Sequence, residues 1–369
     1  MRIALLTPGG VDRSGVDRVI PCLLWLIERL ARRHDVHVFA FSQEAAPDSW
    51  ELLGARVHNI GTLPGWRRRF FATFAAEHRT ARFDVLQAFF GSHGTYAAAV
   101  GRRYSVPVTI YAAGGELVGL RDIGYGMRCG MRGRLALRLA VAGARRITVG
   151  TRYMQRLADD LGIPTELVPL GVALDRWPPA APRARDVTRP ARLLHIADIR
   201  PVKDQQMLLA AVGMLRRAGV PFQLDVAGYD TMNGAMQRVA RDEGVDDVTH
   251  WHGVLHRDAL RALAERADLL LHTSRHDASP VAVLEAAVAG VPAVGTAVGW
   301  VDDWAPAAAR AVPVGDAAAL AREIQALLAD EPLRLALARE AQQRAVAMDA
   351  DYTVGALERV YGELVRQAR

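Results

Sequence analysis

Residues 269–286 read LLLHTSRHDASPVAVLEA and combine two patterns. The apolar run Leu269–His272 is short and bounded by polar residues, which is typical of a buried parallel strand. Pro280 suits the first position of a helix, and Ser279 is expected to cap that helix. Another apolar run, Ala293–Gly295, follows. The stretch therefore predicts a strand–helix–strand unit of an α/β protein.

The same alternation extends through the first half of the chain. Apolar runs predict strands at Ile3–Leu6, Val36–Phe41, Val57–Ile60, Val85–Phe89, Val108–Ala112, Ile147–Val149 and Leu167–Leu170. Helical patterns lie between them at Val16–Arg33, Gly94–Tyr104, Arg132–Ala142 and Arg152–Leu161. Short apolar strands separated by helices indicate a parallel sheet.

Four prolines in residues 177–190 interrupt this pattern and predict a linker. The alternation then resumes, with strands expected at Leu193–Ala197, Phe222–Ala227, Val248–Trp251, Leu269–His272, Ala293–Gly295 and Ala311–Val314. Helices are expected at Lys203–Ala218, Gly234–Glu243, Arg257–Arg266, Pro280–Ala289 and Ala317–Leu328. The sequence thus predicts two doubly wound, Rossmann-like parallel-sheet domains, residues 1–176 and 191–347, that face a cleft.

Composition narrows the class of protein. Of 369 residues, 51% are apolar and 23% are charged, which excludes disordered, collagen-like and coiled-coil chains. The sequence has no uninterrupted apolar run of about 18 residues, and the run after Arg2 is too short for a signal peptide. Its two cysteines, Cys22 and Cys129, fit a reducing compartment. A cytoplasmic location is expected.

The net charge of +6 is unevenly distributed. Basic residues outnumber acidic ones in residues 1–180, whereas acidic residues prevail in the remainder. An anionic partner of the first half is expected, such as a phospholipid surface at the inner face of the membrane. The segment Trp66-Arg67-Arg68-Arg69-Phe70-Phe71 mixes aromatic and cationic residues, as segments that lie on a membrane surface do. An ordinary helix start with a buried Phe pair is the alternative explanation. The sequence carries no nucleic-acid-binding motif, and no such partner is expected.

A glycine-rich turn follows the first predicted strand. It contains Pro8-Gly9-Gly10 and Ser14-Gly15, ahead of a helix expected to begin at Val16. Glycine lets a ligand approach the backbone, and a helix start presents free N–H groups to an anion. The spacing fits neither a dinucleotide fingerprint nor a P-loop, so a plain surface turn remains the alternative.

Two cations follow the first strand after the linker. Arg200 and Lys203 lie at an expected strand-to-helix junction, where they suit a diphosphate. Lys203 is the only lysine among 46 basic residues. Since the chain uses arginine elsewhere, this position favours a specific need for an ammonium group. A solvated helix start is the alternative.

Residues 269–286 supply a third candidate site. With Ser279 as the cap, the N–H groups of Val281 and Ala282 are expected to form an anion site. Asp277, in the preceding loop, is placed to accept hydrogen bonds from sugar hydroxyls, and Glu285 from both hydroxyls of a ribose. A capped core helix with two incidental acids is the alternative. His250 and His252 share a strand face but have no evident third ligand, so no metal site is predicted.

Taken together, these motifs resemble the GT-B glycosyltransferases, specifically the retaining, nucleotide-sugar-dependent glycosyltransferase family 4, or glycosyl transferases group 1. The family's acidic residue, seven spacers and Glu are matched by Asp277 and Glu285, and its Pro-x-Lys motif by 201–203. Further similarity lies at 83–86, 168–172 and 285–299. The closing helix, within 348–369, resembles the family's terminal helix, which crosses back onto the first domain.

The resemblance implies a role for each candidate residue. Arg200, Lys203 and Asp277 are expected to act in catalysis, the two cations on the diphosphate and Asp277 on the transferred sugar. Donor binding is further assigned to Gly15, Gly228, Ser279, Val281, Ala282 and Glu285, with Glu285 on the ribose. Acceptor binding is assigned to Ser14, Gly114, Gly115 and Glu116.

The implied reaction is retaining transfer of a hexose from a UDP- or GDP-linked sugar to a glycan or lipid-linked acceptor, in polysaccharide or glycolipid biosynthesis. No metal and no cofactor are expected. Three positions depart from the family pattern: Asp198 replaces a common Arg, Ala113 a common His, and Asp277 the usual Glu. A nucleotide-sugar epimerase of the same shape and a non-catalytic sugar-nucleotide-binding scaffold are the alternatives.

Overall fold

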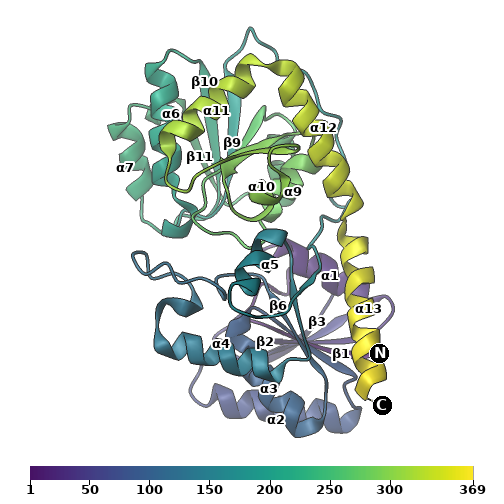
Figure 1. Ribbon diagram of the computed structural model, residues 1–369. Helices are drawn as coiled ribbons and strands as arrows, with labels where there is room; N and C mark the ends of the chain where they lie inside the picture. Colours follow the sequence, from purple (N-terminus) through teal and green to yellow (C-terminus); the bar gives the residue numbers. More distant parts are fainter. Residues whose placement is uncertain (369) are drawn as a thin grey trace. The chain divides into compact units, whose positions relative to one another are not determined.

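The computed structural model describes residues 1–368, apart from the side chain of Ser92. The chain divides into two compact units (Figure 1). Unit 1 contains Met1–Leu170 and the chain from Ala350 onward, and unit 2 contains Gly171–Asp349. Each unit is built around a sheet of parallel strands, and the predicted α/β class is confirmed.

Unit 1 has an eight-stranded sheet with the order β3-β4-β2-β1-β5-β6-β7-β8. Its strands are β1 (Arg2–Thr7), β2 (Asp35–Ala40), β3 (Asp48–Leu52), β4 (Ala55–Asn59), β5 (Val85–Phe89), β6 (Val108–Ala112), β7 (Arg146–Val149) and β8 (Glu166–Leu167). All neighbours pair in parallel except β3, which runs antiparallel to β4. Strand β3 was not predicted, because this polar edge strand lacks an apolar run.

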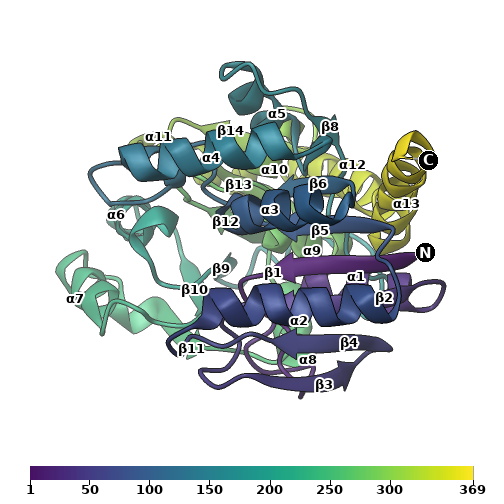
Figure 2. The same ribbon diagram turned by 90° about the horizontal axis from the view of Figure 1, so that it is seen from below.

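The helices of unit 1 cover both faces of its sheet. They are α1 (Pro21–Ala31), α2 (Trp66–Thr80), α3 (Gly94–Tyr104), α4 (Met131–Gly143), α5 (Arg152–Asp159) and α13 (Ala350–Ala368). Figure 2 shows α2, α3 and α4 side by side on one face, and α1 packs on the other with α13 against it. Hydrogen bonds from Thr353 Oγ1 to Pro169 O (2.7 Å) and from Tyr361 Oη to Gln87 Oε1 (2.5 Å) hold α13 in unit 1.

Unit 2 has a six-stranded, fully parallel sheet with the order β11-β10-β9-β12-β13-β14. Its strands are β9 (Ala191–Ile196), β10 (Phe222–Ala227), β11 (Thr249–Gly253), β12 (Leu269–His272), β13 (Ala293–Thr296) and β14 (Ala309–Val312). Its helices are α6 (Gln205–Arg217), α7 (Ala235–Asp242), α8 (Arg257–Ala264), α9 (Val281–Val288), α10 (Gly299–Trp304), α11 (Ala317–Ala329) and α12 (Glu331–Ala347). Helix α10 was not predicted, because its six residues are too few to show a helical period.

The proline-rich segment 177–190 packs along unit 2. The Trp177 side chain is 1% exposed, and its Nε1 donates to the carbonyl oxygen of Glu285 at 3.0 Å. Ala180 N donates to Val288 O. These contacts hold the segment against α9, so it belongs to unit 2. Unit 2 begins at Gly171, whereas the predicted first domain extends to residue 176.

No helix in residues 1–368 is both long enough and apolar enough to span a bilayer.

Candidate active site

The sheet order of unit 2 reverses direction between β9 and β12, which are hydrogen-bonded neighbours. In a doubly wound sheet, ligands bind at the carboxyl ends of the strands at such a switch point. The segment after β9 contains Arg200 and Lys203, and the segment after β12 contains Asp277. The topology therefore brings together two stretches that lie about 70 residues apart in sequence, both of which the motifs had marked.

Lys203 and Asp277 form a direct ion pair at this edge. Lys203 Nζ lies 2.5 Å from Asp277 Oδ2, and both side chains are largely buried, with 24% and 15% exposed. The two loops are joined by Arg275 N, which donates to Val202 O (2.8 Å), and by Thr273 Oγ1, which donates to Lys203 O (2.9 Å). The Arg200 side chain is exposed and pairs with no described residue. One cation is therefore held in place and the other is free to reach an anion.

The charge on Asp277 depends on its neighbours. Burial on its own raises the pKa of this carboxyl, but the charge and the hydrogen bond of Lys203 hold the pKa below its usual value. His272 is 3% exposed, and burial lowers its pKa to about 3, so its ring is neutral. Lys203 thus supplies the positive charge that keeps Asp277 ionised.

Two buried histidines near this pair, His272 and His195, were not among the predicted site residues. His272 Nε2 lies 3.5 Å from Asp277 Oδ2 and has no hydrogen-bond partner among the described residues. His195 is 1% exposed; its Nδ1 lies 2.9 Å from Leu271 O, and its Nε2 accepts a hydrogen bond from Gln205 (3.1 Å). The available signal was their place near the carboxyl ends of β12 and β9, where polar side chains are unusual in buried runs.

Helix α9 begins one residue later than predicted. Its first residue is Val281, Pro280 occupies the cap position, and no side chain caps it. The expectation that Ser279 caps the helix is wrong: its Oγ has no hydrogen-bond partner in the described chain. The first N–H groups of any helix lack intrahelical acceptors, so those of Val281 and Ala282 still point outward from the first turn.

Glu285 lies in the second turn of α9 and is 6% exposed. Burial raises its pKa to about 7, well above the ordinary 4.5. A carboxyl that is buried without a cation is unstable when charged, and it gains most from ligand hydroxyls that donate to it. Such a group meets the need of a ribose-binding residue.

Gly228 lets the loops after β9 and β10 meet. Its backbone lies against Ala197, so that an added Cβ atom would stand 2.0 Å from the Ala197 carbonyl oxygen. Next to this contact, Asp198 Oδ1 accepts the N–H of Tyr229 at 3.1 Å. Asp198, which replaces the family's common Arg, therefore has a local role in tying the two loops together.

Gly228→Ala is expected to destabilise the protein by roughly 1–3 kcal/mol, because the methyl group has no room. Urea unfolding measures the change. The matched control is Gly130→Ala, since a Cβ at Gly130 meets nothing within 4 Å. Equal stability of the two variants would contradict the role given to Gly228.

In unit 1, the turn around Ser14 and Gly15 does not open a helix. Helix α1 begins at Pro21, and the predicted start at Val16 is wrong. Gly15 and Arg18 adopt left-handed φ values of 67° and 48°, which interrupt a helix. Ser14 Oγ accepts the N–H groups of Val16 and Asp17. The anion site expected from a helix start next to Gly15 is therefore absent from this turn.

Glu116 is buried at 3% exposure. Its Oε1 accepts the N–H of Gly91 (2.9 Å) and its Oε2 the N–H of Gly114 (2.7 Å). Burial raises the pKa of Glu116, although the hydrogen bonds from these N–H groups favour its charged form and lower the pKa. Glu116 thus ties the loop after β5 to the loop after β6, and Gly114 and Gly115 border that junction next to Phe90 and Tyr125.

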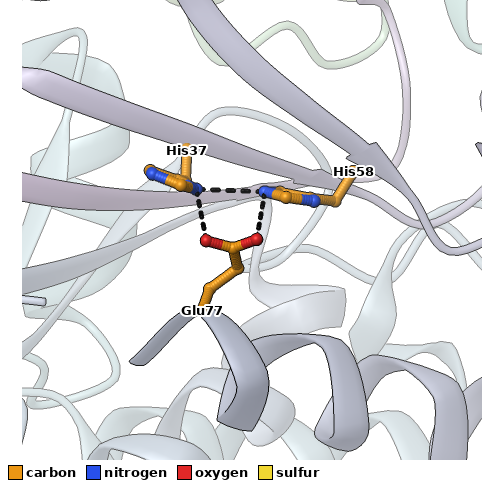
Figure 3. Close-up of side chains that lie close together, drawn as sticks. All are labelled: His37, His58 and Glu77. Carbon is orange, nitrogen blue, oxygen red and sulfur yellow. Dashed lines mark hydrogen bonds and ion pairs between the residues drawn. The ribbon is translucent and has the colours of Figure 1, made fainter. Parts of the chain in front are cut away.

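A separate cluster in unit 1 joins His37 on β2, His58 on β4 and Glu77 on α2 (Figure 3). His37 Nδ1 lies 3.0 Å from His58 Nε2, and burial lowers the pKa of His58 to about 4. Such donor atoms suit a transition metal. However, Arg2 Nη2 lies 2.9 Å from His37 Nε2 and 3.0 Å from Glu77 Oε2. This guanidinium supplies the positive charge that Glu77 needs, so the described contacts account for the cluster without an ion.

Two Rossmann-like units in one chain are the architecture of the GT-B class of fold. The family model "Glycosyl transferases group 1" matches residues 182–344, and "Glycosyl transferase 4-like domain" matches residues 19–172. The chain belongs to the GT-B glycosyl transferases group 1.

Two enzymes are similar to this chain in sequence. Glycogen synthase of Mycobacterium tuberculosis is 32% identical over 176 residues, which make up 47% of this chain and only 42% of that protein. The D-inositol 3-phosphate glycosyltransferase of Salinispora tropica is 28% identical over 98% of this chain and 83% of its own length.

Solved structures share the fold. Sucrose-phosphate synthase of Thermosynechococcus elongatus superposes with a TM-score of 0.83 at 18% identity, over 99% of each chain. Anabaena HepE in complex with UDP-glucose gives 0.77 at 16% identity, over 98% of this chain and all of that one.

Proposed function

We propose that the protein is a retaining glycosyltransferase that moves a hexose from a UDP- or GDP-linked sugar to an acceptor hydroxyl. The observation that carries this proposal is the Lys203–Asp277 pair at the switch point of unit 2, followed in the chain by the buried Glu285 on α9. A lysine ammonium, an ionised carboxylate and a buried carboxyl with a raised pKa suit a diphosphate, a sugar and a ribose respectively. Structures of HepE with UDP-glucose provide further support by analogy.

Lys203 and Arg200 stabilise the leaving diphosphate. When the bond between the sugar C1 and the phosphate oxygen breaks, negative charge grows on the diphosphate and positive charge on the ring. Two cations and the first N–H groups of α9 are placed to meet that negative charge. This set of charges performs the task that a metal ion has in other transferases, and we propose that the reaction is metal-independent.

Asp277 and Glu285 bind the rest of the donor. Asp277 is held ionised by Lys203 and accepts hydrogen bonds from the transferred sugar. Because the same lysine serves Asp277 and the diphosphate, donor binding rearranges the pair seen here at 2.5 Å. Glu285 accepts the two ribose hydroxyls. Ser279 and Gly228 are proposed to border the donor.

In the transfer step, the acceptor oxygen forms its bond to C1 on the face that the diphosphate leaves. The acceptor proton passes to the departing phosphate oxygen, so no protein nucleophile is required. Unit 1 is proposed to bind the acceptor through Ser14, Gly114 and Gly115, with Glu116 fixing the two loops from inside. The acceptor is a glycan or a lipid-linked sugar of a cell-surface polysaccharide or glycolipid, reached from the cytoplasm at an anionic membrane surface.

Product analysis tests the transfer. The protein is incubated with UDP-glucose or GDP-mannose and a mixture of lipid and glycan acceptors, and the product is identified by mass spectrometry and NMR. We expect a new glycoside with the anomeric configuration of the donor. An isomerised nucleotide sugar without glycoside identifies an epimerase, and binding without turnover identifies a scaffold; either result overturns the proposal.

A further inference from the structure

Helix α4 carries an exposed apolar stripe. Met131, Leu135 and Leu139 are 80%, 58% and 55% exposed. Their spacing of four places them along one side of the helix. Leu137 and Ala140 form the opposite, buried side. Packing in unit 1 therefore uses one face of α4 and leaves a second apolar face to solvent.

Arginines flank this stripe. Arg132, Arg134 and Arg138 are exposed and form no ion pair or side-chain hydrogen bond with any described residue. Some exposed arginines in other parts of the protein are paired, as Arg13 is with Asp48 and Arg216 with Asp247. No acidic residue occurs in residues 123–158, which hold eight arginines. The positive charge here is therefore not compensated within its own segment.

The neighbouring helix extends the cationic face. Helix α3 packs alongside α4 (Figure 2), and its last turn exposes Arg102 and Arg103. A groove of about 980 Å³ separates α3 and α4 from the end of α13. Leu139 lines this groove together with Arg102 and Arg145. Apolar and cationic groups thus continue from the stripe into a concave surface.

The segment 66–71, in which the sequence suggested membrane contact, is partly used inside the unit. Phe70 is fully buried, and Trp66 packs on Phe41 and Tyr96. Arg69 donates to the carbonyl oxygens of Ile60 and Leu63. Contacts inside unit 1 explain most of the aromatic and cationic side chains of this segment. They do not explain the exposed apolar stripe on α4.

We propose that the face formed by Met131, Leu135, Leu139 and the arginines 132, 134 and 138 docks on an anionic phospholipid surface. The stripe inserts at the level of the headgroups, and the guanidinium groups bind lipid phosphates. A soluble polyanion would use the arginines alone and leave the three apolar side chains in water. This inference gives the proposed function its membrane-facing surface and rests on that function for its biological role.

Cosedimentation with vesicles tests the proposal on the full chain. We expect binding to vesicles of phosphatidylcholine mixed with phosphatidylglycerol, weakening as salt rises, and little binding to phosphatidylcholine alone. The triple variant R132S/R134S/R138S should bind on the order of 100-fold more weakly. The double variant L135S/L139S should lose about tenfold or more at unchanged charge.

The control R241S/R322S/R339S removes the same charge from exposed arginines of unit 2 and should bind vesicles as the wild type does. Lys203→Met should also bind vesicles normally, so that failure of the donor site and failure of this surface are told apart. The proposal is overturned if L135S/L139S binds like the wild type, which indicates an acidic polymer as the partner. It is equally overturned if the control loses as much binding as R132S/R134S/R138S.

Discussion

Glu285→Gln is expected to stabilise the ligand-free protein at pH 8 and to have a much smaller effect on its stability at pH 5. Burial raises the pKa of Glu285 to about 7 from the ordinary 4.5, so the folded state favours the protonated carboxyl. The stability that this form contributes is complete below about pH 4.5 and is lost as the pH rises through 7. Glutamine removes that loss, which amounts to at most about 3 kcal/mol.

Thermal unfolding of both proteins from pH 5 to pH 8 measures this effect. Glu363→Gln is the matched control, because Glu363 is exposed and its substitution should leave the pH profile as it is. The same Glu285→Gln protein should respond less to nucleotide sugars, since an amide is a weaker acceptor for two ribose hydroxyls. An equal gain in stability at both pH values would show that ionisation of Glu285 is not the cause.

Lys203→Met is expected to lower kcat/KM for transfer on the order of 100-fold, because one fixed cation at the leaving group is lost. It also leaves the Asp277 carboxyl largely buried without its cationic partner, so that the carboxyl is either unpaired or protonated, and the fold is destabilised. Steady-state kinetics and thermal unfolding measure the two effects.

The double variant K203M/D277N separates them. With the buried charge removed, stability should recover while transfer stays low. If K203M/D277N regains transfer, the lysine serves only to neutralise Asp277. If Lys203→Met alone stays within tenfold of the wild type, the diphosphate is held elsewhere.

Local patterns predicted the elements that build the site of unit 2. Strand β12 occupies Leu269–His272, as its apolar run indicates, and α9 differs from expectation by one residue at its start. Both ends of the Lys203–Asp277 pair were marked by motifs. Their meeting depends on the sheet order, which short apolar runs suggest but do not determine.

Other features depend on tertiary contacts that no local pattern carries. The helix expected at Val16 fails because Gly15 and Arg18 adopt left-handed φ values ahead of Pro21. Glu116 was expected to face a substrate, but the N–H groups of Gly91 and Gly114 hold it inside. For Glu116, these N–H groups belong to the loops after β5 and β6, and only the fold brings the loop after β5 to it.

The histidines show the same limit. His272 beneath Asp277, and His37 beside His58, lie within otherwise apolar or mixed strands. Only the folded sheet reveals which groups they contact. Sequence reasoning therefore found the charged residues at strand ends and missed the buried polar groups that support them.

The most direct test of a diphosphate site at Lys203 is a thermal-shift panel of UDP-, GDP-, ADP- and dTDP-sugars on the wild type and on Lys203→Met. A ligand at 100 times its dissociation constant adds about 2.7 kcal/mol to the stability of the protein that binds it. We predict that one nucleotide class stabilises the wild type and that Lys203→Met loses this response. An equal response of the two proteins, or no response of the wild type to any nucleotide sugar, would contradict the account.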